Sequence, residues 1–122
     1  MPTMQILLRN GASSTMLLLF ATVSLAWNEQ SVQVATATQK ILRTHSSHHQ
    51  IATVQNGVSV IVGGLVSGCQ SLYLYPDQDP WTYSTLVAAI SKNVTFTIAY
   101  DVDQKSPWDG KACAITSVSY NQ

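Results

Sequence analysis

A cluster of three histidines, His45, His48 and His49, is the first feature of this 122-residue chain that could do chemistry. On an extended segment His45 and His49 would share one face. No Cys, Asp or Glu lies nearby to complete the three or four converging ligands of a metal site. A catalytic histidine needs a nucleophile and an orienting acid, and the two serines between the histidines are too close in sequence to fit that arrangement. The cluster predicts a surface loop over residues 44–50, with an adventitious metal site as the alternative, and we assign no metal ligand.

Three carboxylates, Asp101, Asp103 and Asp109, lie close together near the end of the chain. Paired carboxylates can act as acid and base in glycoside cleavage or ligate calcium. The spacing of Asp101 and Asp103 lacks the following Gly and Glu of a calcium-binding loop, and a ten-residue loop on a small domain offers little cleft. We expect solvated loop acids, no catalytic residue and no cofactor. A small hydrolase using Asp101 or His49 is the least favoured class.

Aromatic side chains are the most suggestive candidates for ligand contacts. In segment 70–75 two tyrosines alternate with two leucines, so the tyrosines face one side of a strand and the leucines the other. One tryptophan opens a predicted helix, and another lies in a polar loop between Pro107 and Asp109. Such rings can stack on a sugar or anchor a partner protein; the alternative is that a tyrosine face packs on the helix or on a neighbouring subunit. The predicted ligand-binding residues are Tyr73, Tyr75, Trp81 and Trp108.

Five strands must position these side chains. Alternating apolar and polar residues, rich in β-branched and aromatic types, predict strands at about 39–45, 58–62, 70–75, 94–100 and 111–120. Asn56-Gly57 indicates a two-residue hairpin turn, because both residues tolerate positive φ. The apolar residues of the last strand do not keep one parity, which predicts a bulge near Thr116-Ser117.

One helix is predicted from Pro80 to about Ser91, between the third and the fourth strand. Asp79 suits its N-cap and proline suits the first helical position. Asn93 suits its left-handed end. This element order is that of the OB-fold, a five-stranded, partly open Greek-key barrel. We therefore expect a mainly β domain: a five-stranded OB-like barrel, or an antiparallel sheet with the same single helix.

The N-terminus has the pattern of a secretory signal peptide. Arg9 precedes an uncharged apolar stretch at 16–23, and Ser24 and Ala26 occupy the small-residue positions before a cleavage site. A membrane-spanning helix needs about 20 apolar residues. The stretch at 16–23 is shorter, so no membrane insertion is expected. The alternative to a signal peptide is a buried core helix. We predict cleavage after Ala26 and a secreted or periplasmic product. The mature chain would start with a loose lead-in at 27–38, followed by a single domain at 39–122.

Charge and cysteine content narrow the function classes further. Outside residues 1–26 the chain has five basic and six acidic side chains. No basic stripe is present, which argues against nucleic-acid binding. In an exported chain two cysteines most simply form one bridge, here Cys69–Cys113, with two free thiols as the alternative. Closing a loop of about 45 residues would be worth roughly 4 kcal/mol.

From about residue 39 onward the pattern resembles small exported bacterial proteins of OB-like fold, and the binding subunits of pentameric pertussis-like and subtilase-cytotoxin-like toxins. The resemblance is carried by a strand pair, a cysteine before an aromatic strand, a helix of the type L-x-A-A, a β-branched strand and a cysteine in the last strand. In this chain those features are 57–62, Cys69 with Tyr73 and Tyr75, Leu86-Val87-Ala88-Ala89, 94–100, and 113–118.

The resemblance implies an exported, non-enzymatic module that binds glycan and assembles as a pentamer. The alternative is a secreted or periplasmic structural or inhibitory protein that binds another protein.

Overall fold

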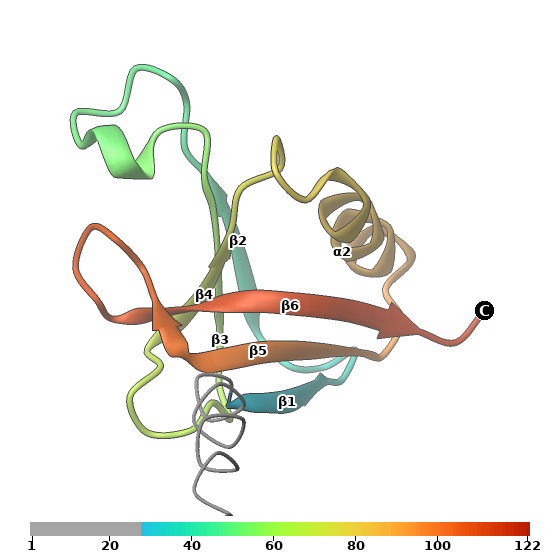
Figure 1. Ribbon diagram of the computed structural model, residues 1–122. Helices are drawn as coiled ribbons and strands as arrows, with labels where there is room; N and C mark the ends of the chain where they lie inside the picture. Colours follow the sequence, from blue (N-terminus) through green and yellow to red (C-terminus); the bar gives the residue numbers. More distant parts are fainter. Residues whose placement is uncertain (1–27) are drawn as a thin grey trace, which may run out of the picture.

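Alternating buried side chains build the strands of one six-stranded sheet in the computed structural model, which describes residues 28–122 (Figure 1). The predicted signal peptide and its cleavage site lie outside the described residues. The strands are β1 (Glu29–Val34), β2 (Lys40–Thr44), β3 (Val58–Val62), β4 (Ser71–Leu74), β5 (Phe96–Lys105) and β6 (Ala112–Tyr120). The helices are a short 3₁₀ helix, η1 (Ala52–Val54), and the α-helix α2 (Pro80–Lys92). Within residues 28–122, no helix has the length and apolar character needed to cross a membrane.

The strand order across the sheet is β1-β5-β6-β4-β3-β2. All neighbours are antiparallel except β4 and β6, which are parallel. The five predicted strands and the helix between the third and the fourth are confirmed. The expected five-stranded barrel or purely antiparallel sheet is wrong, because the sheet is open, mixed and has a sixth strand. The parallel pair arises because α2 and β5 carry the chain from the end of β4 back to the start of β6.

The sixth strand, β1, lies in the segment that was expected to be a loose lead-in, residues 27–38. Its two valines are buried, and they pair with β5 as Val32↔Ile98 and Val34↔Phe96. Two apolar residues are a weak strand signal on their own. The segment forms a strand because β5 offers it apolar side chains to pack against and backbone groups to bond with.

The core lies between α2 and the inner face of the sheet. Its largest fully buried side chains include Leu72, Leu86, Phe96, Ile98 and Tyr100. Leu86 and Ala89 are the buried residues of α2, which packs beside β6 (Figure 1). The Tyr100 hydroxyl accepts a hydrogen bond of 3.1 Å from the Val66 amide, so this buried polar group is satisfied.

Both predicted helix-end positions are confirmed. Asp79 occupies the N-cap, although its side chain makes no capping hydrogen bond; its backbone carbonyl accepts from the Tyr83 amide at 3.0 Å. Asn93 ends the helix in the left-handed region with φ 54°.

The predicted bulge in the last strand is also confirmed. The register between β5 and β6 changes from Ala99↔Ser117 to Tyr100↔Ile115, which leaves Thr116 as the extra residue. A second irregularity follows, between Asp101 and Lys105. Because β5 continues to Lys105, Asp101 and Asp103 lie in this strand and not in the loop expected from the sequence.

The connection between β2 and β3 differs from the predicted tight hairpin. Asn56 has positive φ, 60°, as expected, but η1 precedes it, and residues 45–57 form a long loop. The Gly57 amide donates to the Val54 carbonyl at 3.0 Å. A Cβ at residue 57 would stand 3.0 Å from that oxygen, so a larger residue here would require the turn to shift by a few tenths of an ångström.

The predicted disulfide is confirmed. Cys69 and Cys113 are bonded with their Cα atoms 5.5 Å apart and 44 residues apart in sequence. The bond joins the segment before β4 to β6, and both cysteines belong to the core.

Replacing both cysteines by alanine should lower the free energy of unfolding by about 4 kcal/mol, because the unfolded chain loses its cross-link. Urea denaturation of the oxidised protein and the variant measures the difference. Reducing the native protein should give a similar loss, and a loss below about 1 kcal/mol would contradict the entropic role of the bond.

Candidate functional site

The side chains that point away from the core on β2, β3 and β4 share one outer face. On β3, Val58, Val60 and Val62 are buried while Ser59 and Ile61 are only partly covered. The registers place Arg43 opposite Ser59 and Ser59 opposite Tyr73, so one row of side chains runs across the three strands. At one end of this face lie the loops 45–57 and 106–111, drawn in green and orange in Figure 1.

Three of the four predicted aromatic residues form a row on this face. The ring centroids of Tyr73 and Tyr75 are 5.9 Å apart, and those of Tyr73 and Trp108 are 5.3 Å apart, both in edge-to-face geometry. Tyr73, in the middle, is only 6% exposed, and its hydroxyl donates to the Lys105 carbonyl at 3.2 Å. Tyr73 therefore supports its two neighbours, and Tyr75 and Trp108 are left to offer ring surface.

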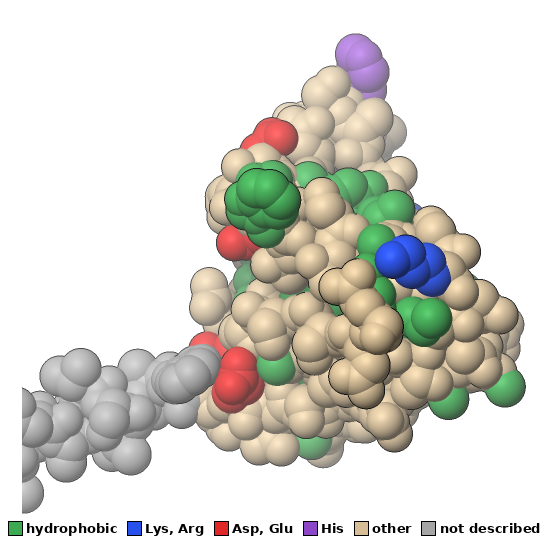
Figure 2. Space-filling model, turned by 90° about the vertical axis from the view of Figure 1, so that its right-hand side faces the viewer, with side chains coloured by type: hydrophobic (Ala, Val, Ile, Leu, Met, Phe, Trp, Pro, Cys, Tyr) green, Lys and Arg blue, Asp and Glu red, His purple; other side chains and the backbone are tan. Residues whose placement is uncertain are grey.

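The fourth aromatic residue, Trp81, does not join the row. It opens α2, is 86% exposed, and lines neither of the two hollows described below. On the face of the molecule that carries α2, hydrophobic side chains are scattered among polar atoms, with acidic groups along one side (Figure 2). The sequence could not separate Trp81 from the other aromatics, because position at a helix start does not reveal which loops lie beside it.

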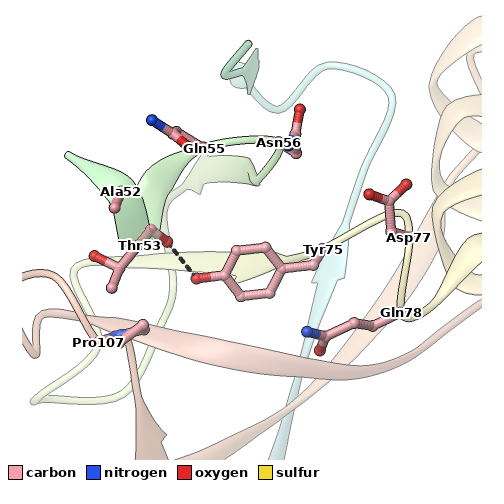
Figure 3. A pocket seen from close by; sticks show the side chains of 8 residues that line it. All are labelled: Ala52, Thr53, Gln55, Asn56, Tyr75, Asp77, Gln78 and Pro107. Carbon is pink, nitrogen blue, oxygen red and sulfur yellow. Dashed lines mark hydrogen bonds between the residues drawn. The ribbon is translucent and has the colours of Figure 1, made fainter. Parts of the chain in front are cut away.

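A hollow of about 430 Å³ lies beside Tyr75. Figure 3 shows the Tyr75 ring between loop residues 52–56 and the turn at 77–78, with Pro107 approaching from the neighbouring loop. The Tyr75 hydroxyl donates to the Thr53 carbonyl at 2.6 Å, which fixes the ring against the loop. We call this site the Tyr75 hollow; its principal side chains are Gln55, Asn56, Tyr75, Asp77, Gln78 and Pro107.

The hydroxyl groups of the two tyrosines stay protonated at neutral pH. Burial raises the pKa of Tyr75 above its ordinary value. Burial, followed by the proximity of Tyr75 and Asp101, raises the pKa of Tyr73. Both hydroxyls can therefore donate the hydrogen bonds described above.

A second hollow, of about 260 Å³, lies at the Trp108 end of the row. We call it the Trp108 hollow; the side chains that matter are Arg43, His45, His49, Ser59, Ser71 and Trp108, with Asp109 at its margin. His45 Nε2 lies 3.3 Å from Ser59 Oγ, and the His45 and His49 rings meet edge to face at 5.3 Å. Burial, followed by the nearby His49 and Arg43, lowers the pKa of His45.

The structure brings together two of the three clustered histidines, as their spacing predicted. His45 and His49 line the Trp108 hollow, whereas His48 is exposed and does not. Among residues 28–122, no group of three or more His, Cys, Asp or Glu side chains could hold a metal ion. The basic residue that sequence reasoning missed is Arg43. The signal that could have found it is its spacing of two residues from His45, which directly follows β2.

The carboxylates have structural partners. Asp101 is 6% exposed, so the expectation of a solvated loop acid is wrong for this residue. Its Oδ1 accepts from the amides of Asn28 at 3.3 Å and Asp103 at 2.9 Å. Asp109 Oδ1 accepts from the Ser106 hydroxyl at 2.8 Å and the Lys111 amide at 2.9 Å. Asp109 therefore joins the two ends of the 106–111 connection, whereas Asp101 holds the backbone at Asn28 and within β5.

No protein-family model matches this chain, and comparisons with curated proteins and with solved structures find no match. The function must therefore be inferred from the two hollows and the face between them.

The lowered pKa of His45 makes folding stability depend on pH. Because the folded state binds this proton less readily than the unfolded state, stability falls as the pH drops below about 6.5. A His45→Gln variant should lose less stability than the native protein between pH 7.5 and pH 5.5, as measured by urea denaturation at both pH values. His48→Gln is the matched control and should keep the native dependence; identical curves for all three proteins would contradict this role of His45.

Proposed function

We propose that the protein is an exported, non-enzymatic binding module that recognises a saccharide at the Tyr75 hollow. The observation that supports this most directly is the combination of a fixed aromatic ring with neutral amide side chains and one carboxylate around it. A sugar ring presents an apolar C–H face and a rim of hydroxyl groups. Tyr75 offers a surface for the face, while Gln55, Gln78 and Asp77 offer both donors and acceptors for the rim.

The composition of the Tyr75 hollow favours binding over hydrolysis. Glycoside hydrolysis generally uses two carboxyl groups that flank the scissile bond. Of the described residues that line the hollow, only Asp77 carries a carboxyl group. The amide side chains of the hollow, Gln55, Asn56 and Gln78, can orient a ligand but cannot exchange a proton with it at neutral pH.

The chain path supports the same function. We propose that strands β2 to β6, in the spatial order β2-β3-β4-β6-β5, follow the Greek-key path of an OB-fold, with α2 between the third and the fourth of these strands. The two edge strands of the sheet, β1 and β2, are joined by the five residues 35–39. OB-folds bind oligosaccharides with the loops between their first and second and their fourth and fifth strands. Here those loops are 45–57 and 106–111, and both border the Tyr75 hollow.

Binding to a glycan array tests the proposal. Asp77→Asn and Gln78→Ala should each weaken binding of the recognised saccharide by about tenfold, because the first replaces a charged acceptor by a neutral amide and the second removes a hydrogen-bonding amide. Trp81→Ala, which changes an exposed aromatic residue outside the hollow, is the matched control and should bind as the native protein does. The proposal fails if no glycan binds, or if only the Trp81 variant loses binding.

Assembly into a homo-oligomeric ring, as in the pentameric toxin subunits that the sequence resembles, is the further part of this proposal. Native mass spectrometry of the exported protein tests it separately, and a strict monomer would remove the toxin-like version without affecting saccharide binding by a single subunit.

One observation favours binding of a protein partner as the second candidate function. The His45 amide donates to the Gly57 carbonyl at 2.9 Å, and bonded pairs alternate along an antiparallel ladder. Leu42 and Thr44 of β2 therefore direct their backbone groups away from β3, at an edge of the sheet. A partner could add an extended strand there.

Selection of extended peptides displayed on phage tests this second function. Thr44→Pro should abolish peptide binding, because proline removes an outward N–H donor. Gln78→Ala is the control and should leave peptide binding unchanged. Enrichment of no peptide, or equal binding by the proline variant, would reject strand addition at β2.

A further inference from the structure

Basic side chains gather in the Trp108 hollow from two different elements. Arg43 projects from β2, while His45 and His49 belong to the loop that follows it. The mutual proximity of these groups is unfavourable when they are charged, and it contributes to the lowered pKa of His45. Within residues 28–122, the Arg43 guanidinium makes no side-chain hydrogen bond. These three basic side chains outnumber the one carboxylate that lines the hollow, Asp109.

The one carboxylate at the margin of the hollow is already engaged. Asp109 Oδ1 accepts two hydrogen bonds, from the Ser106 hydroxyl and the Lys111 amide, and these hold the 106–111 loop. Arg43, His45, His49 and Asp109 are the charged or titratable side chains that line the hollow among the described residues. The strands β3 and β4 contribute only neutral groups to its lining, including Ser59 and Ser71.

The remaining groups in the hollow suit an anion with several oxygen atoms. A guanidinium group presents paired N–H donors to a planar oxyanion edge. The Ser59 and Ser71 hydroxyls can donate as well, and a protonated imidazole donates from both nitrogens. Trp108 adds an apolar ring to the lining of the hollow.

We infer that the Trp108 hollow binds an oxyanion, such as a sulfate, phosphate or carboxylate group. This site uses different residues from the Tyr75 hollow and stands whether or not a saccharide binds there. The oxyanion can be a free ion or an acidic group on a larger ligand. A bound anion stabilises the protonated histidines, so binding takes up protons and strengthens as the pH falls through the histidine range.

Titration with sodium sulfate, followed by NMR of the histidine rings and backbone amides, tests the site directly. Sodium chloride at equal ionic strength is the reference. Sulfate should raise the pKa of His45, and its affinity should be higher at pH 5.5 than at pH 7.5. A sulfated disaccharide and its unsulfated counterpart form a second arm, which distinguishes a free ion from an acidic group on a saccharide.

Matched variants separate a built site from general electrostatic attraction. Arg43→Gln and His49→Gln should each weaken sulfate binding about tenfold, because each removes a charge-assisted hydrogen bond. Lys92→Gln makes the same change in net charge on α2 and should bind sulfate as the native protein does. Gln78→Ala should also leave the sulfate response unchanged, which keeps this test independent of the Tyr75 hollow.

Two results would overturn the inference. One is histidine titration curves that are the same in sulfate and in chloride, with no response to the sulfated disaccharide. The other is equal weakening by Arg43→Gln and Lys92→Gln, which would show attraction to net charge alone. A response to the sulfated disaccharide that requires Arg43, even without a response to free sulfate, supports the site and identifies its ligand as an acidic saccharide.

Discussion

The two halves of the sheet meet at one short seam, the parallel pairing of β4 with β6. Only three residue pairs form it: Ser71↔Ala112, Leu72↔Cys113 and Tyr73↔Ala114. One half of the sheet is β1-β5-β6 and the other is β4-β3-β2, and no other strand pairing connects them among the described residues. A ladder this short is weak on its own, so the disulfide between Cys69 and Cys113 at the same place is the constraint on which the arrangement of the two halves depends.

Other contacts reinforce the seam around the disulfide. The Gln70 amide donates to the Lys111 carbonyl at 2.9 Å, and the Lys105 ammonium donates to the Gly68 carbonyl at 2.8 Å. The Tyr73 hydroxyl reaches the Lys105 carbonyl across the same junction. The segment before β4 is thus held to the start of β6 by a covalent bond and to the end of β5 and the residue before β6 by hydrogen bonds. This explains how a small domain can fix two loops that are distant in sequence.

The candidate site depends on this junction. Tyr73 is a seam residue, and the row from Tyr75 to Trp108 crosses from the β4 half of the sheet to the loop that leads into β6. Each hollow is lined by side chains from both halves. Near the hollows, the acidic side chains hold the backbone, whereas the basic side chains are open to a ligand. Asp101 and Asp109 are committed to backbone amides and a hydroxyl, whereas Arg43, His45 and His49 face an open hollow.

The sequence by itself determined the local features, because these depend on neighbours along the chain. Alternation of Leu72 with Tyr73 fixed the two faces of β4, Asn93 set the end of α2, and the broken parity of the last strand located the bulge at Thr116. The pairing of the only two cysteines was also predictable, because the sequence predicts a signal peptide and two cysteines in an exported protein most simply form one bridge. Helix propensity, side-chain parity and capping act over a few residues and can be read without knowing the fold.

Only the tertiary structure decided which distant segments meet. β1 became a strand because β5 offered it an apolar edge, and β4 paired with β6 in parallel because the helix returned the chain to that side. The grouping of Tyr75 with Gln55 and Gln78, and the exclusion of Trp81, follow from the approach of loops far apart in sequence. Such contacts depend on the packing of the whole sheet and on the disulfide that joins its two halves. No short sequence pattern predicts them, because each pairing depends on which strand edges and which space in the core the rest of the chain leaves unoccupied.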